Sequence, residues 1–266
     1  MGFVAVDRAS VFITDCGARD ARAVLLLHGL ACDAHDWSWQ IAPLATRRRV
    51  VAVDLVGHGR SSTRQDSYDP VSLARDAAVV LETLGIARSS VIGHSLGAVV
   101  ASALAVERAD LVESLVTFDL ALELPEPDQD TAERVAAAIL SGEGVSVLDA
   151  DYGRIEPGED EWLSTWRLRR LAGTPAHVVA DAYLGLRRAP ASNAAKGWME
   201  YLARRRCPVL AISRDADLAR LDESTFEHPL SRAEVWDGCG HWLHQQRAEA
   251  ANTAILSWLD TTAELA

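Results

Sequence analysis

The sequence has few cysteines, no long apolar segment and no excess of basic residues. Its four cysteines, Cys16, Cys32, Cys207 and Cys239, are not spaced as zinc ligands or as a CxxC redox pair. No stretch reaches the ~20 apolar residues that a membrane-spanning helix requires, so we expect no membrane insertion. The 26 basic residues against 38 acidic ones give a net charge of −12. This balance disfavours a nucleic-acid partner, because phosphate binding requires a clustered positive surface.

The amino-terminal residues also lack a secretion signal. The start, MGFVAVDRASVF, has no basic region followed by an apolar segment. We therefore expect a cytoplasmic protein with reduced thiols. Its 266 residues, of which 49% are hydrophobic, are enough to bury a core without disulfide bonds or metal ions.

Short β-branched segments alternate with helical patterns in the first half of the chain. An edge hairpin is expected first, and the expected strands that follow it are residues 24–27, 49–53, 90–92 and 112–118. The expected helices between them are residues 37–45, 70–84 and 96–107. Such alternation predicts βαβ units, which form a mostly parallel sheet with helices on both faces.

This alternation stops after Asp119. Residues 123–130 (ELPEPDQD) are acidic and contain two prolines, which is typical of a linker, and the pattern from there to about residue 203 is helical. Strand signals resume at residues 208–212 and 233–236, before a last amphipathic helix.

The pattern predicts an α/β core formed by residues 1–122 and 204–266. The intervening residues 123–203 are expected to form a helical cap inserted after the sixth core strand. A cap over the carboxyl ends of the strands would cover the place where open α/β sheets bind ligands.

A serine motif follows the expected strand at residues 90–92. Residues 93–97 (GHSLG) fit the pattern G-x-S-x-G, and they lead directly into the expected helix at residues 96–107. This strand–turn–helix context is what a nucleophile elbow requires, whereas the alternative is an ordinary glycine-rich turn. Small residues at 93 and 97 would let the strand and helix approach closely, and Ser95 would be the nucleophile.

A serine hydroxyl needs a base to accept its proton, and the base needs an orienting acid. The elbow architecture predicts the chain order Ser, acid, His. His241 follows the last expected strand in a glycine-rich loop, DGCGHW, and is the expected base. His244 is the competing residue, one turn further on, where a role on a helix face is expected.

The acid has three candidates. The strand at residues 208–212 is followed by Arg214-Asp215-Ala216-Asp217, and Asp217 is preferred because this strand neighbours the histidine loop. Asp215 is one alternative. Asp119, at the end of the strand at residues 112–118, is the other.

An oxyanion hole requires two backbone N–H donors. The elbow architecture places one at Leu96 and the other at Leu30, in the loop after the first parallel strand. His28 is then expected to fix that loop through a side-chain hydrogen bond. The spacing of His28, His35, His58 and His94 matches no metal-ligand pattern, so we expect no metal and no cofactor.

With these residues, the chain resembles the α/β-hydrolase superfamily, in its branch of small serine esterases, haloperoxidase-like enzymes and C–C hydrolases. The resemblance covers the expected core, 1–122 and 204–266. The residues that carry it are His28-Gly29, the turn at 54–61, the elbow at 93–97, Asp217 and Gly240-His241.

The resemblance implies an α/β-hydrolase fold in which the turn at 54–61 is structural. Because Ser95 stands at the nucleophile position, dehalogenases and epoxide hydrolases of this fold, which use an aspartate there, are disfavoured. Arg214 is a departure, since the family usually has a glycine at that position.

The expected activity is hydrolysis of a carboxylic ester, or of a lactone or thioester, through an acyl-enzyme on Ser95. Alternatives with the same residues are a C–C bond hydrolase, a lyase such as a hydroxynitrile lyase, and a non-enzymatic small-molecule receptor. The expected partner is a small apolar or aromatic ester. The sequence does not reveal the oligomeric state.

The expected cap is rich in aromatic residues. Trp162 and Trp166 are four residues apart and share a helix face, so they are candidate pocket residues. The alternative is that the aromatic residues only pack the cap onto the core, and this applies equally to Tyr152, Tyr183, Trp198 and Tyr201. Cys32 and Cys239 are expected near the site as wall residues rather than nucleophiles.

Overall fold

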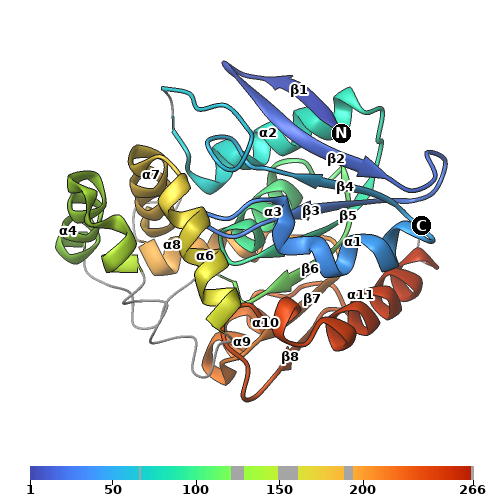
Figure 1. Ribbon diagram of the computed structural model, residues 1–266. Helices are drawn as coiled ribbons and strands as arrows, with labels where there is room; N and C mark the ends of the chain where they lie inside the picture. The colour runs from blue at the N-terminus through green and yellow to red at the C-terminus, as the bar shows by residue number, and fades with distance from the viewer. Residues whose placement is uncertain (66, 121–128, 149–160, 189–193, 265–266) are drawn as a thin grey trace.

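An eight-stranded sheet forms the centre of the computed structural model, in the order β1-β2-β4-β3-β5-β6-β7-β8 (Figure 1). The structure describes residues 1–65, 67–120, 129–148, 161–188 and 194–264. The first two strands pair antiparallel with their neighbours, and all later neighbours are parallel. The strands are β1 (Gly2–Val6), β2 (Ala9–Cys16), β3 (Ala23–Leu27), β4 (Arg49–Val53), β5 (Ser89–His94), β6 (Val112–Phe118), β7 (Val209–Ser213) and β8 (Arg232–Val235).

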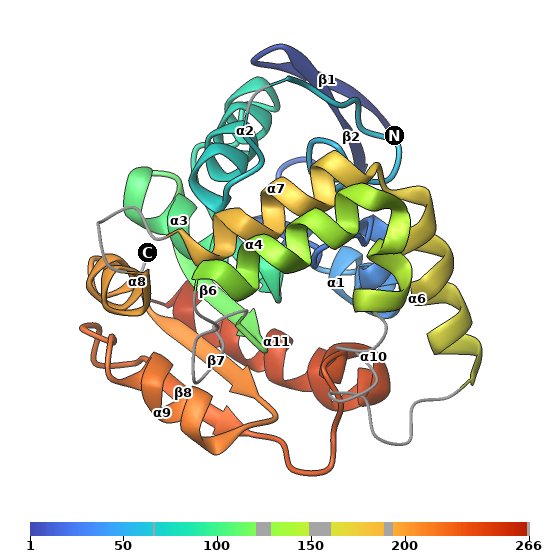
Figure 2. The same ribbon diagram turned by 90° about the vertical axis from the view of Figure 1, so that its left-hand side faces the viewer.

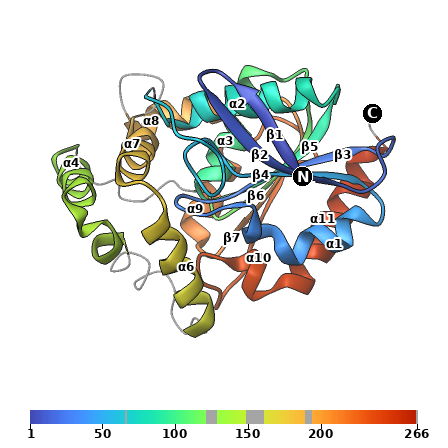
Figure 3. The ribbon, with the colours of Figure 1, turned by 45° about the horizontal axis from the view of Figure 1, so that its top comes forward.

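Helices connect these strands and cover both faces of the sheet. Figure 3 shows α2 and α3 on one side and α1 and α11 on the other. None of the helices in the described ranges is both long and apolar enough to span a membrane. The helices are η1 (Ala34–Trp37), α1 (Ser38–Ala45), α2 (Pro70–Thr83), α3 (Leu96–Glu107), α4 (Gln129–Ala138), η2 (Ile139–Glu143), α6 (Glu161–Gly173), α7 (Ala176–Arg187), α8 (Ala194–Leu202), α9 (Ala216–Glu223), α10 (Leu243–Gln246) and α11 (Ala248–Ala263).

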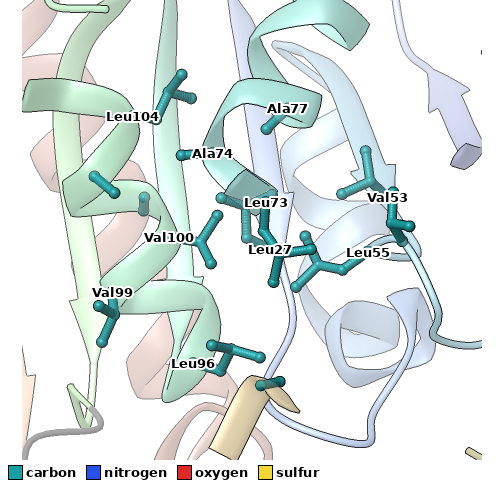
Figure 4. Packing of buried hydrophobic residues seen from close by; sticks show 14 of the residues in the cluster. Leu27, Val53, Leu55, Leu73, Ala74, Ala77, Leu96, Val99, Val100 and Leu104 are labelled. Atoms are coloured by element: carbon teal, nitrogen blue, oxygen red, sulfur yellow. The ribbon is translucent and has the colours of Figure 1, made fainter. Parts of the chain in front are cut away.

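The core consists of two apolar layers, one on each face of the sheet. Successive side chains of a strand point to opposite faces, so Leu25 and Leu27 of β3 join one layer while Val24 and Leu26 join the other. Figure 4 shows Leu27 meeting side chains of α2 and α3 in the first layer. All five residues of β3 are buried, as expected for a parallel strand covered on both faces.

Every regular element that the structure describes between β6 and β7 is a helix. We call α4, α6, α7 and α8 the inserted helices; they lie together beyond one end of the sheet (Figures 1 and 2). A Cβ added to Gly57, which follows β4, would lie 2.7 Å from a methyl group of Val178 in α7. The inserted helices therefore pack closely against the carboxyl ends of the strands.

The fold class predicted from the sequence is confirmed, as are the strands and the longer helices of the core. One local detail differs. Residues 216–223 form α9, which was not expected. Asp215 caps this helix by accepting hydrogen bonds from the N–H groups of Asp217 and Leu218.

Candidate active site

Ser95 lies at a sharp turn between β5 and α3. Its backbone has φ 53° and ψ −118°, a conformation that residues other than glycine rarely adopt. A Cβ on Gly93 would overlap the backbone of Gly97, and a Cβ on Gly97 would overlap the backbone of Leu27. The two glycines therefore allow the close approach of strand and helix that the GHSLG sequence predicts.

The turn is held by its neighbours at the carboxyl ends of the strands. The N–H of Ser95 donates to the backbone oxygen of Phe118, the last residue of β6, over 2.9 Å. A Cβ added to Gly29, in the loop after β3, would lie 3.4 Å from the Cβ of Ser95. The serine is 8% exposed, so it is largely enclosed by these segments.

His241 and Asp119 form a short hydrogen bond beside this turn. The two atoms, Nδ1 of His241 and Oδ2 of Asp119, are 2.5 Å apart, and both residues are buried. Asp119 directly follows β6, with φ 44°, and its N–H donates to the backbone oxygen of Ile212. Because β5 and β6 are neighbours, Ser95 and Asp119 stand at adjacent strand ends.

The structure corrects the choice of the acid. Asp217 lies in the first turn of α9, its side chain is 73% exposed, and it pairs with Arg220 rather than with His241. Asp215 is occupied as the cap of the same helix. Asp119, the remaining candidate, contacts the imidazole instead. The physical reason is that the chain after β7 turns at once into a helix, which directs Asp217 into solvent.

Arg214 also contacts the Asp119 carboxylate. Its Nε lies 2.9 Å from Oδ2 of Asp119, and its backbone N–H lies 3.3 Å from Oδ1. Burial alone would raise the pKa of Asp119, but His241 and Arg214 outweigh it and lower that pKa to about 2. The sequence pattern marks Arg214 only as a departure from the family's usual glycine, and it does not predict this contact with Asp119.

The imidazole of His241 is held in its neutral form. Burial lowers its pKa below the ordinary value of 6.5; the hydrogen bond to Asp119 opposes this effect, while electrostatic interactions with His94 and Arg214 add to it. A neutral imidazole whose Nδ1–H donates to a carboxylate has its Nε2 available to accept a proton.

His244 does not share this environment. Burial lowers its pKa well below the usual range, and its ring packs against Trp37 and His94, with centroids 4.5 and 4.6 Å away. The hydrogen bond to Asp119 is made by His241. This arrangement favours the sequence-based choice of His241 over His244.

The two residues expected to form the oxyanion hole lie in suitable backbone positions. Leu96 is the first residue of α3, where a helix leaves N–H groups without an intrahelical acceptor. Leu30 belongs to the loop that packs against the elbow, and the next residue, Ala31, has φ 55°. The role of both N–H groups stays a prediction.

Two structural expectations are confirmed. Nε2 of His28 accepts a hydrogen bond from the N–H of Leu55 over 2.9 Å, which ties the loop after β3 to the turn after β4. In that turn the buried Asp54 accepts hydrogen bonds from Arg60 and from the N–H of Ala34. The turn at 54–61 thus holds backbone segments in place.

The aromatic residues of the inserted helices divide into two groups. Tyr183, Trp198 and Tyr201 are at most 6% exposed and pack into the core, whereas Tyr152 lies outside the described residues. Trp162 and Trp166 share a face of α6, with ring centroids 6.2 Å apart, and Trp162 is 50% exposed.

A hollow of about 530 Å³ lies between α6 and the core loops. Trp166 lines it together with Cys32 and Gly59. Burial raises the pKa of the Cys32 thiol well above its usual value, so this cysteine is not an activated nucleophile. Cys239 is also buried, and none of the four cysteines, all of which lie in the described residues, forms a disulfide bond.

In the part of the chain that the structure describes, one group of side chains could be considered as metal ligands. Asp36, His94 and His244 are completely buried, and one potential ligand atom of each lies within 4.8 Å of the others. However, the guanidinium of Arg170 already pairs with the Asp36 carboxylate. Because a metal ion here would lie beside that cation, we do not assign the group to a metal.

Comparison with known proteins identifies similar chains over nearly the full length. A model of the alpha/beta hydrolase family matches residues 24–254. The magnesium-chelatase 30 kDa subunit of Rhodobacter capsulatus is 28% identical, over 94% of this chain and 90% of that protein. A hydrolase from Pseudomonas aeruginosa PA01 superposes with a TM-score of 0.84 at 24% identity, over 97% of both chains. A thermophilic esterase from Thermogutta terrifontis, with malate bound, superposes with a TM-score of 0.82 at 23% identity, over 96% of this chain and 94% of that chain.

Proposed function

The chain belongs to the alpha/beta hydrolase family, and from this premise we propose that it cleaves a carboxylic ester through an acyl-enzyme on Ser95. The observation that carries the proposal is the 2.5 Å hydrogen bond between His241 and Asp119 beside a serine held in a strained turn. A neutral, oriented imidazole next to a hydroxyl is the arrangement that activates serine as a nucleophile.

The reaction follows from these groups. His241 takes the proton of Ser95 as the hydroxyl oxygen attacks the ester carbon. The N–H groups of Leu30 and Leu96 donate to the developing oxyanion. His241 then returns the proton to the leaving alcohol, and a water molecule cleaves the acyl-enzyme by the same route.

Asp119 keeps the imidazole in the required tautomer and stabilises its cation during each transfer. Its pKa of about 2 keeps the carboxylate charged throughout the neutral range. Arg214 Nε donates to the same oxygen of Asp119 as His241 does, and the Arg214 N–H and the Ser213 hydroxyl donate to the other oxygen, so the orientation of the carboxylate is fixed.

The substrate that we propose is a small apolar or aromatic ester. Trp166 lines the hollow between α6 and the core, beside Cys32 of the loop that would supply the oxyanion donor. An indole on this wall supports selection of an apolar acyl or alcohol group. Trp162, which is half exposed, would lie at the outer edge of the same face.

A substrate screen with one variant tests the proposal. Purified protein is assayed on p-nitrophenyl esters of increasing acyl length, on lactones and on vinylogous diketones. We expect ester turnover, and we expect Ser95→Ala to lower kcat by about 10⁴-fold or more because the nucleophile is removed. Ser224→Ala, which changes an exposed serine at the end of α9, is the matched control and should keep wild-type activity.

Two outcomes would overturn this assignment. Ester turnover retained in folded Ser95→Ala protein would exclude Ser95 as the nucleophile. Turnover of diketones without turnover of any ester or lactone would replace ester cleavage by C–C bond hydrolysis.

A further inference from the structure

Asp36 is a buried carboxylate outside the Ser95–His241–Asp119 group, and segments from three parts of the chain meet at it. It lies in η1 and is 0% exposed. Arg170 of α6 donates to its Oδ1, and Gln245 of α10 donates to the same oxygen over 3.0 Å. Its other oxygen, Oδ2, lies 3.8 Å from Nδ1 of His94. One carboxylate therefore joins an inserted helix, the segment after the histidine loop, and the elbow.

The contacts continue from His94 to the backbone of His241. Nε2 of His94 lies 2.9 Å from the backbone oxygen of His241, and the two rings pack with centroids 4.6 Å apart. Because a carbonyl oxygen only accepts, His94 must donate this hydrogen bond. The side chain of His94, the residue before Ser95, thus holds the backbone of His241.

A second route links η1 to the same segment. Gln245 donates to the backbone oxygen of Asp36 over 3.3 Å, in addition to its bond to the carboxylate. Gln40, just after η1, donates to the backbone oxygen of His244 over 2.8 Å. The chain following His241 is therefore attached at two successive residues, His244 to α1 and Gln245 to η1.

The charge of Asp36 is balanced from the inserted helices. The side chain of Arg170 is 10% exposed, and it also lies 3.9 Å from Asp33. Burial alone would raise the pKa of Asp36, but Arg170 and His94 outweigh it and hold that pKa well below its usual range. Removing one partner of a buried ion pair is strongly destabilising, so loss of Arg170 would leave an uncompensated buried charge at Asp36.

Resting on the proposed function, we infer that Asp36 and His94 are positioning residues that couple docking of α6 to the placement of His241. Docking brings Arg170 onto Asp36, which fixes the side chains of Gln245 and His94. Those two in turn fix the backbone around His241, so that its imidazole meets Ser95 and Asp119 correctly. Turnover is then efficient only while the inserted helix lies on the core.

Two arginines of the inserted helices provide the test. Arg170→Met removes the contact to Asp36, whereas Arg134→Met changes an exposed arginine of α4 and serves as the matched control. With p-nitrophenyl acetate, we expect Arg170→Met to lower kcat by about 10- to 100-fold while KM changes by less than about threefold. Rates are expressed per active site, counted with a fluorophosphonate, so that loss of folded protein does not mimic the effect. Arg170→Lys should recover part of kcat, and Arg134→Met should match the wild type.

A spectroscopic measurement separates this inference from the proposed function. The short His241–Asp119 hydrogen bond should give a downfield proton resonance, assigned by its loss in His241→Gln. We expect Arg170→Met and Asp36→Asn to shift or broaden this resonance and Arg134→Met to leave it unchanged. This result would support the coupling even if no ester were hydrolysed, in which case only the proposed function would fail.

The inference is overturned if Arg170→Met and Asp36→Asn are folded, have the wild-type kcat per active site and leave the resonance unchanged. Should either single variant fail to fold, the double variant Asp36→Asn/Arg170→Met decides, because it removes both buried charges together. Reduced kcat with a perturbed resonance in the double variant supports the coupling, and wild-type values for both contradict it.

Discussion

The ends of β6 and β7 are neighbours in the sheet, and each is followed by acidic residues that could orient His241. At the end of β6, Asp119 comes directly after the strand and points to the imidazole, 2.5 Å away. After β7, the chain turns within two residues into α9, where Asp215 caps the helix and Asp217 faces solvent. The backbone that follows each strand, rather than the presence of an acid, decides which carboxylate reaches the histidine.

The two carboxylates also differ in their surroundings. The side chain of Asp119 is 2% exposed and shares its charge with His241 and Arg214, whereas Asp217 has one partner, Arg220, and is screened by water. Only the buried carboxylate can stabilise an imidazolium strongly. The comparison therefore places the carboxylate that contacts His241 at the end of β6 and the carboxylate that caps a helix at the end of β7.

The largest expected effect is at the acid itself. Asp119→Asn should lower kcat by about 10⁴-fold, because an amide favours the wrong imidazole tautomer. Asp217→Asn is the matched control and should leave kcat within about twofold of the wild type, as expected for an exposed pair. Steady-state kinetics on the best ester, with circular dichroism to verify folding, provides the measurement. A large loss of kcat in Asp217→Asn with little loss in Asp119→Asn would instead identify Asp217 of α9 as the acid.

Arg214 connects the two strand ends, and its removal should change the pH profile. Asp119, Arg214 and His94 face His241. Burial, together with electrostatic interactions with His94 and Arg214, lowers the pKa of His241, so the acid limb of kcat/KM should lie below pH 6.5. In Arg214→Gln, protonation of the imidazole becomes easier and its pKa rises. As the pH falls, the neutral form of His241 is then lost at a higher pH than in the wild type, so the acid limb of kcat/KM moves to higher pH. At pH 8 we expect kcat to fall by only about fivefold, the effect of one hydrogen bond.

Arg220→Gln is the control for that profile, since Arg220 pairs with Asp217 at the surface. It should leave the acid limb where it is in the wild type. A limb that stays fixed in Arg214→Gln as well would contradict the electrostatic role of Arg214.

The smallest expected effect concerns the helix cap after β7. Asp215→Ala removes the acceptor for two N–H groups of α9 and should lower the free energy of unfolding by about 1 kcal/mol. For a chain of this size that corresponds to a Tm about 2–4 °C lower. We expect kcat to change by less than about twofold, because the capping bond does not involve His241. A large loss of kcat with an unchanged Tm would instead indicate that Asp215 acts in catalysis.

The sequence was sufficient for the parts of the protein that local patterns determine. Strand and helix periodicity predicted the sheet and the inserted helices, and the GHSLG sequence predicted the turn at Ser95 because only small residues fit at 93 and 97. The loop position of His241 after the last strand followed from the same order of elements.

The remaining residues depend on contacts that no local pattern encodes. The sequence favoured Asp217 over Asp119, because both follow strands and the difference lies in the hydrogen bond that Asp119 makes across 122 residues of sequence. Asp36 was missed for a similar reason, since its partners lie 134 and 209 residues away. One signal was available for α9: Asp215 followed by a helical pattern is a typical cap, which would have removed Asp217 from consideration.

The rate at which a fluorophosphonate labels Ser95 tests the central claim most directly, because it reports activation of the hydroxyl without requiring the natural substrate. Labelling is followed by mass spectrometry of the peptide that contains Ser95, in wild-type, Asp119→Asn and Asp217→Asn protein. The account predicts rapid labelling at Ser95 in the wild type and in Asp217→Asn, and much slower labelling in Asp119→Asn. Modification at another residue, or equal rates in all three folded proteins, would contradict it.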